Sequence, residues 1–545
     1  MITERLGELL RAALTRAARD GIIASELPTV RFEKPRRREH GDWATNVALS
    51  VAGGANPRPI AQAIVDRLPQ SDLVDHVEVA GPGFLNVYLS PVWLIDVVRR
   101  AADDSADFGR SDAGAGVEVN VEFVSSNPTG PINVASGRHA AVGDAIANLL
   151  EATGSSVTRE FYINDTGRQM QLFAESVAAR YLQSFGIDAQ VPEGGYKGDY
   201  LADIAARIRA EKGDSLVNAS SADRASVILD SALGEMLDQM RGSLERFGTR
   251  FDIWSSQRKL NSGAVDEVIG KLRELGFVEE REGAQFFTAT KFGDDKDRVV
   301  VRSSGEPTYL ASDAAYLADK FARGFDRLIY LWGADHHGTV ARLFAVVEAL
   351  GFDRQNVEIR LVQMVTISGE KGSKRAGVVV ALDDLIDEVG ADAARYTFLT
   401  RSTDAPLDFD IDLVKEQAPE NPVYYVQYAH ARICSILRKA VAQGIRFEGR
   451  EAPLKVLGHP SEETLMRKLA SYEEVVVQAA ELRAPQRISR YVEDLASDFS
   501  SFYRDCRVIG EAADVEAARL TLCVATKNVI ADGLGMLGVS APERM

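Results

Sequence analysis

The stretch VNVEFVSSNPTGPINVASGRHAAVG, residues Val119 to Gly143, decides how this chain folds. It opens with the alternating apolar residues of a strand, breaks at the NPTGP of residues 127–131, and continues into residues rich in Ala and Gly. A Pro/Gly turn between a strand and a helix of small residues lets the helix N-terminus approach a phosphate closely. The stretch therefore predicts a nucleotide-binding corner in an α/β domain.

The length and composition indicate a globular protein of several domains. At about 100–200 residues per domain, 545 residues correspond to three or four domains. Hydrophobic residues make up 46% and charged residues 26%, as in ordinary soluble proteins. No apolar run approaches the roughly 18–20 residues of a membrane span, so we expect no membrane association and a cytoplasmic location. Cys434, Cys506 and Cys523 lack metal-ligand spacing, which favours reduced core residues and no metal site.

The net charge of −17 argues against a general polyanion binder, which needs an excess of cationic side chains on one face. Local basic clusters remain possible partners for a phosphate. They are residues 36–38, residues 371–375, and Arg483, Arg487 and Arg490, the last three spaced along one helical face. Taken alone, each cluster is more simply a solvated surface.

Three regions of different periodicity follow one another. Residues 1–112 combine helical stretches with a hairpin at 76–89, which predicts a small α+β domain. In residues 113–404 strands alternate with helices, which predicts a Rossmann-type α/β domain with a helical insertion at about 165–285. Residues 405–545 are helical almost throughout, which predicts an all-α bundle.

A second informative segment is QMVTISGEKGSKRAG, from Gln363 to Gly377. A strand runs into a glycine-flanked loop that carries Lys371 and Lys374. Ammonium groups on such a loop can neutralise the charge that develops on a triphosphate as pyrophosphate leaves. Alone the pattern marks a surface loop, but together with the upstream corner it supports a nucleotide site.

Both segments resemble the signatures of class I aminoacyl-tRNA synthetases, and the first resembles that of arginyl-tRNA synthetases in particular. The resemblance covers nearly the whole chain, because four further segments share it: RRREHGDWATNVAL (36–49), EPTYLASDAAY (306–316), LIYLWGADHHG (328–338) and ENPVYYVQYAHARICSILRKA (420–440). It implies the family's Rossmann catalytic domain, its N-terminal additional domain and its helical anticodon-binding domain.

The first signature departs from the family pattern. Where the family has His-x-Gly-His, this chain has Asn133-Val134-Ala135-Ser136. Asn133 can donate from its amide without a positive charge, Ala135 adds a methyl group, and Ser136 is a shorter donor. A lost transition-state donor reduces the rate about 10²–10³-fold, so we predict weakened adenylation with binding retained. His139, one turn further along the predicted helix, is offset from the lost positions, which favours a structural role.

The resemblance implies which residues bind the small substrates. For arginine they are Ser125 and Asn127 at the backbone groups, Tyr309 and Asp313 at the guanidinium, Asp335 as a second acidic contact, and Glu122 as a ligand or a support. For ATP they are Thr129, Asn133, Ala135, Ser136, Gly333, His336, His337, Gln363, Met364, Val365, Lys371, Ser373 and Lys374, of which Asn133, Ser136, Lys371 and Lys374 would be catalytic. Mg²⁺ would accompany ATP. From the residues alone, Asp313 also suits a helix N-cap, and the two histidines a capping or packing pair.

For tRNA the resemblance implies Trp43 and Asn46 in the N-terminal domain, and Tyr424, Arg432, Arg438 and the terminal Met545 in the bundle. Flat tyrosine faces can stack on unpaired bases, and arginines can pair with phosphates. Trp43 and Asn46 serve equally well to pack their domain. Aromatic residues at helical spacing are usually core, and we expect this of Tyr425 and Tyr428.

Three hypotheses about activity follow. The first is an arginine–tRNA ligase that forms arginyl-adenylate from ATP and L-arginine and transfers the arginyl group to the 3′ end of tRNA(Arg), acting as a monomer. The second is a divergent paralogue that serves drug tolerance or a biosynthetic pathway. The third is a non-catalytic tRNA-binding protein, which would have no use for Tyr309, Asp313 and Asp335 together.

Overall fold

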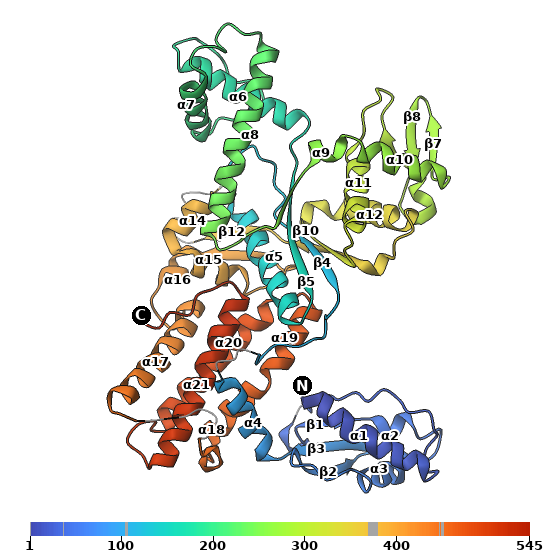
Figure 1. Ribbon diagram of the computed structural model, residues 1–545, viewed down its shortest axis with the longest axis vertical. Coiled ribbons are helices and arrows are strands. Elements are labelled where there is room, and N and C mark those ends of the chain that lie inside the picture. Colours follow the sequence, from blue (N-terminus) through green and yellow to red (C-terminus); the bar gives the residue numbers. More distant parts are fainter. Residues whose placement is uncertain (1, 36, 104–106, 369–379, 446, 448–451) are drawn as a thin grey trace.

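The computed structural model describes residues 2–545 except 36, 104–106, 369–379, 446 and 448–451. A central α/β domain carries two projections on one side, and a helical bundle and a small N-terminal domain on the other (Figure 1). The predicted fold class is confirmed. Within the described residues, every helix is too short or too polar to cross a membrane.

The N-terminal domain packs helices against a three-stranded antiparallel sheet of order β1-β3-β2. Its elements are α1 (Ile2–Arg19), β1 (Trp43–Thr45), α2 (Val47–Ser50), α3 (Pro57–Val65), β2 (Val74–Ala80) and β3 (Phe84–Leu89). The predicted hairpin is β2–β3, turning at Gly81 and Gly83, whose φ values of 51° and 143° suit glycine. Helix α4 (Pro91–Ala102) then leads away and packs against the bundle helices.

The central sheet has five parallel strands in the order β11-β10-β4-β5-β6. They are β4 (Glu118–Glu122), β5 (Ser156–Ile163), β6 (Ile253–Ser256), β10 (Arg327–Gly333) and β11 (Val357–Val362). Along the chain, β5 and then β6 add to one side of β4, and β10 and then β11 add to its other side. In such sheets ligands bind beyond the carboxyl ends of the strands where the order reverses, here β4 and β10.

Helix α5 (Val134–Ala152) begins within the first signature and packs closely on the sheet. A Cβ atom at Gly143 would lie 2.2 Å from the ring of Phe123, so only glycine allows this approach. The close packing brings the N-terminus of α5 toward the end of β4, as the small residues of the sequence predicted.

The predicted helical insertion is interrupted by a strand of the central sheet. Helices α6 (Arg168–Gln183), α7 (Tyr200–Lys212) and α8 (Ser221–Arg246) form one projection, after which the chain returns as β6. The second projection contains α9 (Gln257–Asn261), α10 (Ala264–Glu274), β7 (Val278–Arg281), β8 (Ala284–Phe287), β9 (Arg298–Val301), α11 (Tyr309–Ala322) and α12 (His337–Ala349). Strand β6 escaped notice because it is a four-residue, half-buried edge strand with little periodic signal.

The expectation that residues beyond 405 are helical fails at one place. Strand β13 (Leu407–Asp410) pairs in parallel with β12 (Val365–Ser368), so the end of the catalytic region includes a two-stranded sheet. Four alternating residues are too few to stand out in a helical window. The remaining elements are α14 (Leu382–Val389), α15 (Ala391–Phe398), α16 (Ile411–Lys415), and the bundle helices α17 (Pro422–Ala442), α18 (Pro460–Ala470), α19 (Tyr472–Glu481), α20 (Gln486–Asp505) and α21 (Ala513–Met536).

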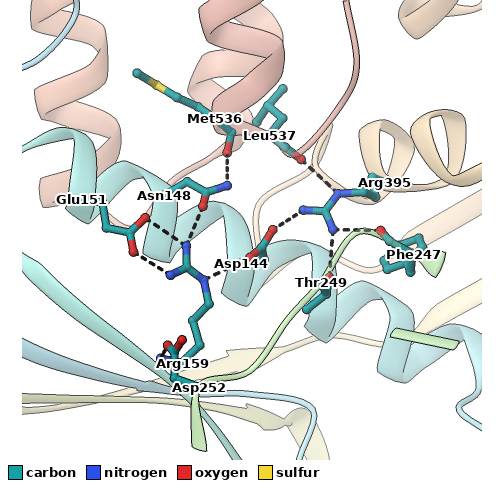
Figure 2. Close-up of polar contacts among 10 residues, drawn as sticks. All are labelled: Asp144, Asn148, Glu151, Arg159, Phe247, Thr249, Asp252, Arg395, Met536 and Leu537. Atoms are coloured by element: carbon teal, nitrogen blue, oxygen red, sulfur yellow. Dashed lines mark hydrogen bonds and ion pairs between the residues drawn. The ribbon is translucent and has the colours of Figure 1, made fainter. Parts of the chain in front are cut away.

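A buried polar network ties α5 to the bundle (Figure 2). Arg395 is 1% exposed and pairs with Asp144 of α5 at 2.5 Å. Its guanidinium also donates to the carbonyls of Phe247 and Leu537, at 3.0 and 3.2 Å. Arg159 of β5 pairs with the other oxygen of Asp144 at 3.1 Å. The helix that follows the first signature is therefore clamped between the central sheet and the end of the bundle.

The three cysteines are buried in the bundle and form no disulfide. This agrees with the prediction of reduced core residues. Burial raises the pKa of the Cys523 thiol to about 12, so it stays protonated.

Candidate active site

A cavity of about 430 Å³ lies at the carboxyl ends of β4 and β10, at the reversal point of the sheet. Strand β4 contributes Glu122, and the segment after it contributes Ser125. Helix α11 contributes Tyr309 and Asp313, and β10 ends in the cavity with Gly333. The cavity therefore joins residues from segments far apart in the sequence, at the position that the sheet order predicts for a ligand.

The chain leaves β4 through a left-handed turn. Val124 and Ser125 have φ values of 68° and 41°, a conformation that costs a non-glycine residue roughly 1–2 kcal/mol. Such backbone strain concentrates at functional sites. The turn directs the Ser125 hydroxyl inward, where it donates to Glu122 Oε1 at 3.1 Å and accepts from the Tyr162 amide at 3.2 Å.

Glu122 is already paired within the protein. Its Oε2 accepts from Lys320 Nζ at 2.6 Å, and the Lys320 side chain is fully buried. The same ammonium lies 4.3 Å from the ring centre of Tyr316 and 4.1 Å from that of Tyr330. Because its charge is compensated and it holds Ser125, Glu122 fits a supporting role better than that of a direct arginine ligand.

Asp313 presents an uncompensated carboxyl group to the cavity. Burial and, after it, the nearby Glu122 together raise its pKa to about 7, while Arg342 acts in the opposite direction. A desolvated acid beside another acid gains most from a cationic ligand, and a guanidinium pairs with carboxylates in bidentate fashion. Tyr309 begins α11 at the cavity mouth with 62% of its surface exposed. Asp313 is not the N-cap of this helix, since Thr308 occupies that position.

The cavity concentrates polar atoms without partners. The described residues hold ten buried side-chain nitrogen or oxygen atoms that lack a hydrogen bond, and five belong to residues that line this cavity. They are His139 Nδ1, Tyr162 Oη, Asn164 Oδ1, Gln257 Oε1 and Arg342 Nε. Buried polar atoms are nearly always paired in native proteins, so the wall of this cavity is the place where the polar groups of the described residues are least satisfied.

The altered signature is satisfied internally. Asn133 is the N-cap of α5, and its Oδ1 accepts from the Ser136 amide at 2.8 Å. The Ser136 hydroxyl lies 3.1 Å from that of Ser126. Asn133 also bridges to Ala381 in the segment that follows the second signature. The cavity lining includes His139 but none of the altered positions Asn133, Ala135 and Ser136.

The other predicted arginine ligands lie apart from the guanidinium pocket. Asp335 is not among the residues that line the cavity, and its side chain is 82% exposed, 3.7 Å from His336 Nε2. The structure therefore does not bring Asp335 to Tyr309 and Asp313, because the turn after β10 carries it outward. Asn127 donates to Gln169 of α6.

The predicted nucleotide residues are only partly brought together. Gly333 and His336 line the cavity, whereas His337 is exposed and starts α12. Thr129 is buried, and its carbonyl accepts from Tyr200 Oη at 2.6 Å.

At the start of the second signature, the Gln363 carbonyl accepts from Arg138 at 2.8 Å. Met364 is 67% exposed, and Val365 begins β12. Lys371, Ser373 and Lys374 lie outside the described residues.

Among the cavity residues that sequence reasoning missed are Tyr162, Asn164, Gln257 and Arg342, each with a buried polar atom that lacks a partner. Tyr162 is the second-last residue of β5, the strand beside β4, and Asn164 directly follows that strand, so their place at a strand end was a usable signal. Gln257 directly follows β6, a strand that was not predicted, and Arg342 lies within α12, so neither carried a usable signal. Gln257 reaches the cavity because Asp165 accepts from the Ser256 hydroxyl at 2.6 Å and so holds the start of α9 beside β5.

Two of the predicted tRNA residues of the bundle, Tyr424 and Arg432, lie in one surface patch with Tyr428. Tyr424 and Tyr428 stack with ring centres 5.9 Å apart, and Arg432 lies 4.6 Å over the Tyr428 ring. Tyr428 is 39% exposed, so the expectation that it is core is wrong: it lies on the outer face of α17. Tyr425 does pack against the core.

The remaining tRNA predictions divide between core and surface. Trp43 is 5% exposed and packs its domain, whereas Asn46 is exposed. Arg438 donates to the Glu543 carbonyl at 3.2 Å, and Met545 is 55% exposed.

A Rossmann-type domain with its cavity beside the first signature, an N-terminal α+β domain and a C-terminal helical bundle define a class I aminoacyl-tRNA synthetase. The class I (R) tRNA synthetase catalytic domain matches residues 106–405. The arginyl-tRNA synthetase N-terminal domain matches residues 4–89, and the DALR anticodon-binding domain matches residues 426–545. The chain belongs to the arginyl-tRNA synthetase family.

Relatives support this over the full length. The chain is 48% identical to the arginine–tRNA ligase of Moorella thermoacetica, with 98% of each chain covered. It is 45% identical to that of Desulforamulus reducens, with 100% of this chain and 99% of the relative covered. The arginyl-tRNA synthetase structure from Thermus thermophilus matches with a TM-score of 0.78 over 100% of both chains at 22% identity, which supports the fold.

Proposed function

We propose that this chain is an arginine–tRNA ligase. It activates L-arginine with ATP to give arginyl-adenylate and pyrophosphate, and then transfers the arginyl group to the 3′ end of tRNA(Arg). The observation that carries the proposal is the Asp313 carboxyl in the cavity at the sheet reversal, with a pKa raised to about 7 by burial and by Glu122. Such a group suits the cationic side chain of arginine.

The arginine subsite is built on α11 and the turn after β4. Asp313 and Tyr309 receive the guanidinium, because both face the cavity and Asp313 has no ion pair of its own within the described contacts. Ser125 contacts the amino-acid backbone groups from its strained turn, and Asn127 does so from the following loop. Glu122 keeps Ser125 in place through their 3.1 Å hydrogen bond.

ATP binds at the N-terminus of α5, with its phosphates toward the two signatures. Helix N-termini favour phosphate through their free amides and their dipole. The described residues hold no cluster of three or more metal-ligating side chains, and Mg²⁺ is expected to arrive bound to the ATP phosphates as part of that substrate. Lys371 and Lys374 supply positive charge to the triphosphate as pyrophosphate leaves.

The altered first signature weakens adenylation without abolishing it. Asn133 Oδ1 is occupied by the helix cap, which leaves its amide nitrogen as the one donor for a phosphate. Ser136 contributes only a hydroxyl that already contacts Ser126. Removing a transition-state donor typically slows a reaction about 10²–10³-fold, so the exchange rate is expected to lie well below that of a protein with both histidines.

The bundle patch of Tyr424, Tyr428 and Arg432 receives unpaired bases of tRNA, with stacked rings and a cation at one edge. The protein acts as a cytoplasmic monomer. The alternative role of a paralogue in drug tolerance or a biosynthetic pathway has no observation in its favour.

The test is ATP–pyrophosphate exchange with arginine, measured with and without tRNA(Arg). The wild type is compared with a variant that carries Asn133→His, Ala135→Gly and Ser136→His together. We expect tRNA-dependent exchange by the wild type and a faster rate in the variant. Exchange by neither protein would reject the site assignment, whereas exchange by the variant alone would show that the altered signature abolishes activity.

A further inference from the structure

Arg342 brings a positive charge to the wall of the substrate cavity, and the proposed function gives it no role. It lies in the second turn of α12, and two residues before it on the chain, His336 and Thr339, line the same cavity. Residues three positions apart share one face of a helix, so this face of α12 forms part of the cavity wall. Arg342 therefore lies beside the same space as Asp313 of α11.

The Arg342 side chain is half-buried and unpaired. Within the described part of the chain, no hydrogen bond or ion pair involves its guanidinium. Its Nε atom is the one nitrogen of this group that is both unpaired and covered by protein, so the two Nη atoms are unpaired but accessible. A guanidinium at a partly desolvated site is normally paired with a carboxylate or a phosphate. The Nη atoms are therefore free to take an anionic group of a ligand.

The charge of Arg342 is close to that of Asp313 but is not neutralised by it. Burial and then Glu122 raise the pKa of Asp313 to about 7, and Arg342 acts in the opposite direction, which requires the two charges to lie near each other. They nevertheless form no ion pair among the described contacts. Two opposite charges that line one cavity without pairing are complementary to a ligand that carries both signs of charge.

Arginine is such a ligand. When its guanidinium pairs with Asp313, its α-carboxylate is left to the remainder of the cavity, where Ser125 offers only an uncharged hydroxyl. The phosphates of ATP fit Arg342 less well, because the altered positions Asn133, Ala135 and Ser136 at the start of α5 do not line this cavity. The position of Arg342 thus favours the amino acid over the nucleotide.

We propose that Arg342 binds the α-carboxylate of arginine through its Nη atoms while Asp313 binds the guanidinium. The proposal rests on the proposed function, because it takes arginine as the ligand of the cavity. With one charge for each end of the substrate, the cavity selects an amino acid, which has a carboxylate to activate, over a guanidino amine that has none.

Agmatine, which is arginine without its carboxylate, is the matched ligand for a test. The dissociation constants of arginine and agmatine are measured by calorimetry at pH 8 with the full-length wild type and with Arg342→Gln. We expect Arg342→Gln to weaken arginine about ten- to hundredfold, the effect of losing a hydrogen bond between charged groups. Agmatine should stay within about twofold or bind more tightly, because Arg342 no longer repels its two cationic ends.

Two further variants control for charge and structure. Arg342→Lys keeps the positive charge but not the two parallel donors, so its affinity for arginine should lie between those of the wild type and Arg342→Gln. Arg354→Gln removes an exposed arginine that pairs with Glu348 of the same helix, and it should leave both ligands unaffected. Thermal melting of each variant shows whether a loss of binding follows a loss of structure.

Equal losses for arginine and agmatine in Arg342→Gln would overturn the proposal, because Arg342 would then act only through the charge of Asp313. Unchanged arginine binding would overturn it as well, and so would a loss of ATP binding in place of arginine binding. Failure of the wild type to bind arginine would instead refute the proposed function, so the two failures are distinguishable.

Discussion

The arginine side and the nucleotide side of the cavity treat their polar groups in opposite ways. On the arginine side Asp313 faces the cavity with a raised pKa, and neighbouring polar atoms lack partners. On the nucleotide side Asn133 and Ser136 bond to one another and to their own loop. The first side is organised for a ligand at the expense of its own stability, whereas the second has become a well-capped helix start. The substitutions at Asn133 and Ser136 on the nucleotide side have therefore left the arginine side unchanged.

The two sides can differ in this way only if α5 is held in the same place whatever residues stand at its N-terminus. Arg395, 1% exposed, holds α5 through Asp144 and also bonds the segment after α21 (Figure 2). Arg395→Ala leaves Asp144 and several acceptors without this partner, and we expect it to lower the free energy of unfolding by about 3–5 kcal/mol. Urea denaturation followed by circular dichroism measures the change.

The matched control is Arg504→Ala, which removes an exposed arginine whose one ion pair within the described part of the chain is with the adjacent Asp505. Exposed pairs contribute little, so its denaturation midpoint should stay near that of the wild type. Similar midpoints for all three proteins would show that the network does not hold α5.

The arginine side can be tested by removing its charge. Asp313→Asn keeps the shape of the side chain but leaves a guanidinium without its anion in a desolvated site. We expect kcat/KM for arginine to fall about a hundredfold or more, with ATP affinity unchanged, in steady-state kinetics and binding measurements. Asp319→Asn on the same helix, where Asp319 pairs with Arg323 at 2.9 Å, serves as the control and should have little effect. Equal kinetics in the two variants would contradict the assignment of Asp313.

Lowering the pH should weaken the binding of arginine at this side of the cavity. Arginine binds the ionised form of Asp313, whose pKa in the free protein is raised to about 7. Below that pH the carboxyl is protonated and the attraction is lost; above it the carboxylate is present. Between pH 8 and pH 6 the ionised fraction falls about tenfold, so the Kd for arginine should rise about tenfold over this range. Calorimetric titrations at several pH values measure this, and Asp313→Asn should flatten the profile.

Sequence reasoning succeeded where the signal was local and failed where it depended on tertiary pairing. The corner at residues 127–136 and the parallel sheet were predictable because strand and helix periods differ. The pairing of Glu122 with Lys320 was not, because these residues are 198 positions apart and meet only when α11 packs on β4. The exposure of Asp335 and the position of Gln257 in the cavity wall were also not predictable, because both depend on the direction in which loops leave the sheet.

The smallest expected effect separates the two uses of Asn133. Asn133→Ala removes the acceptor that caps α5 and should lower the free energy of unfolding by about 1 kcal/mol, because the Ser136 amide loses its partner. Asn133→Asp retains an acceptor at Oδ1 and should stay near wild-type stability, yet it replaces the amide donor with a negative charge and should slow pyrophosphate exchange. If both variants melt alike, the cap does not explain why asparagine is tolerated at this position, and the nucleotide side is less well satisfied than its contacts indicate. If they differ as expected, the altered signature stabilises the start of α5 while it weakens phosphate binding. Asn133 then serves the stability of its own helix, whereas Asp313 serves the binding of a ligand.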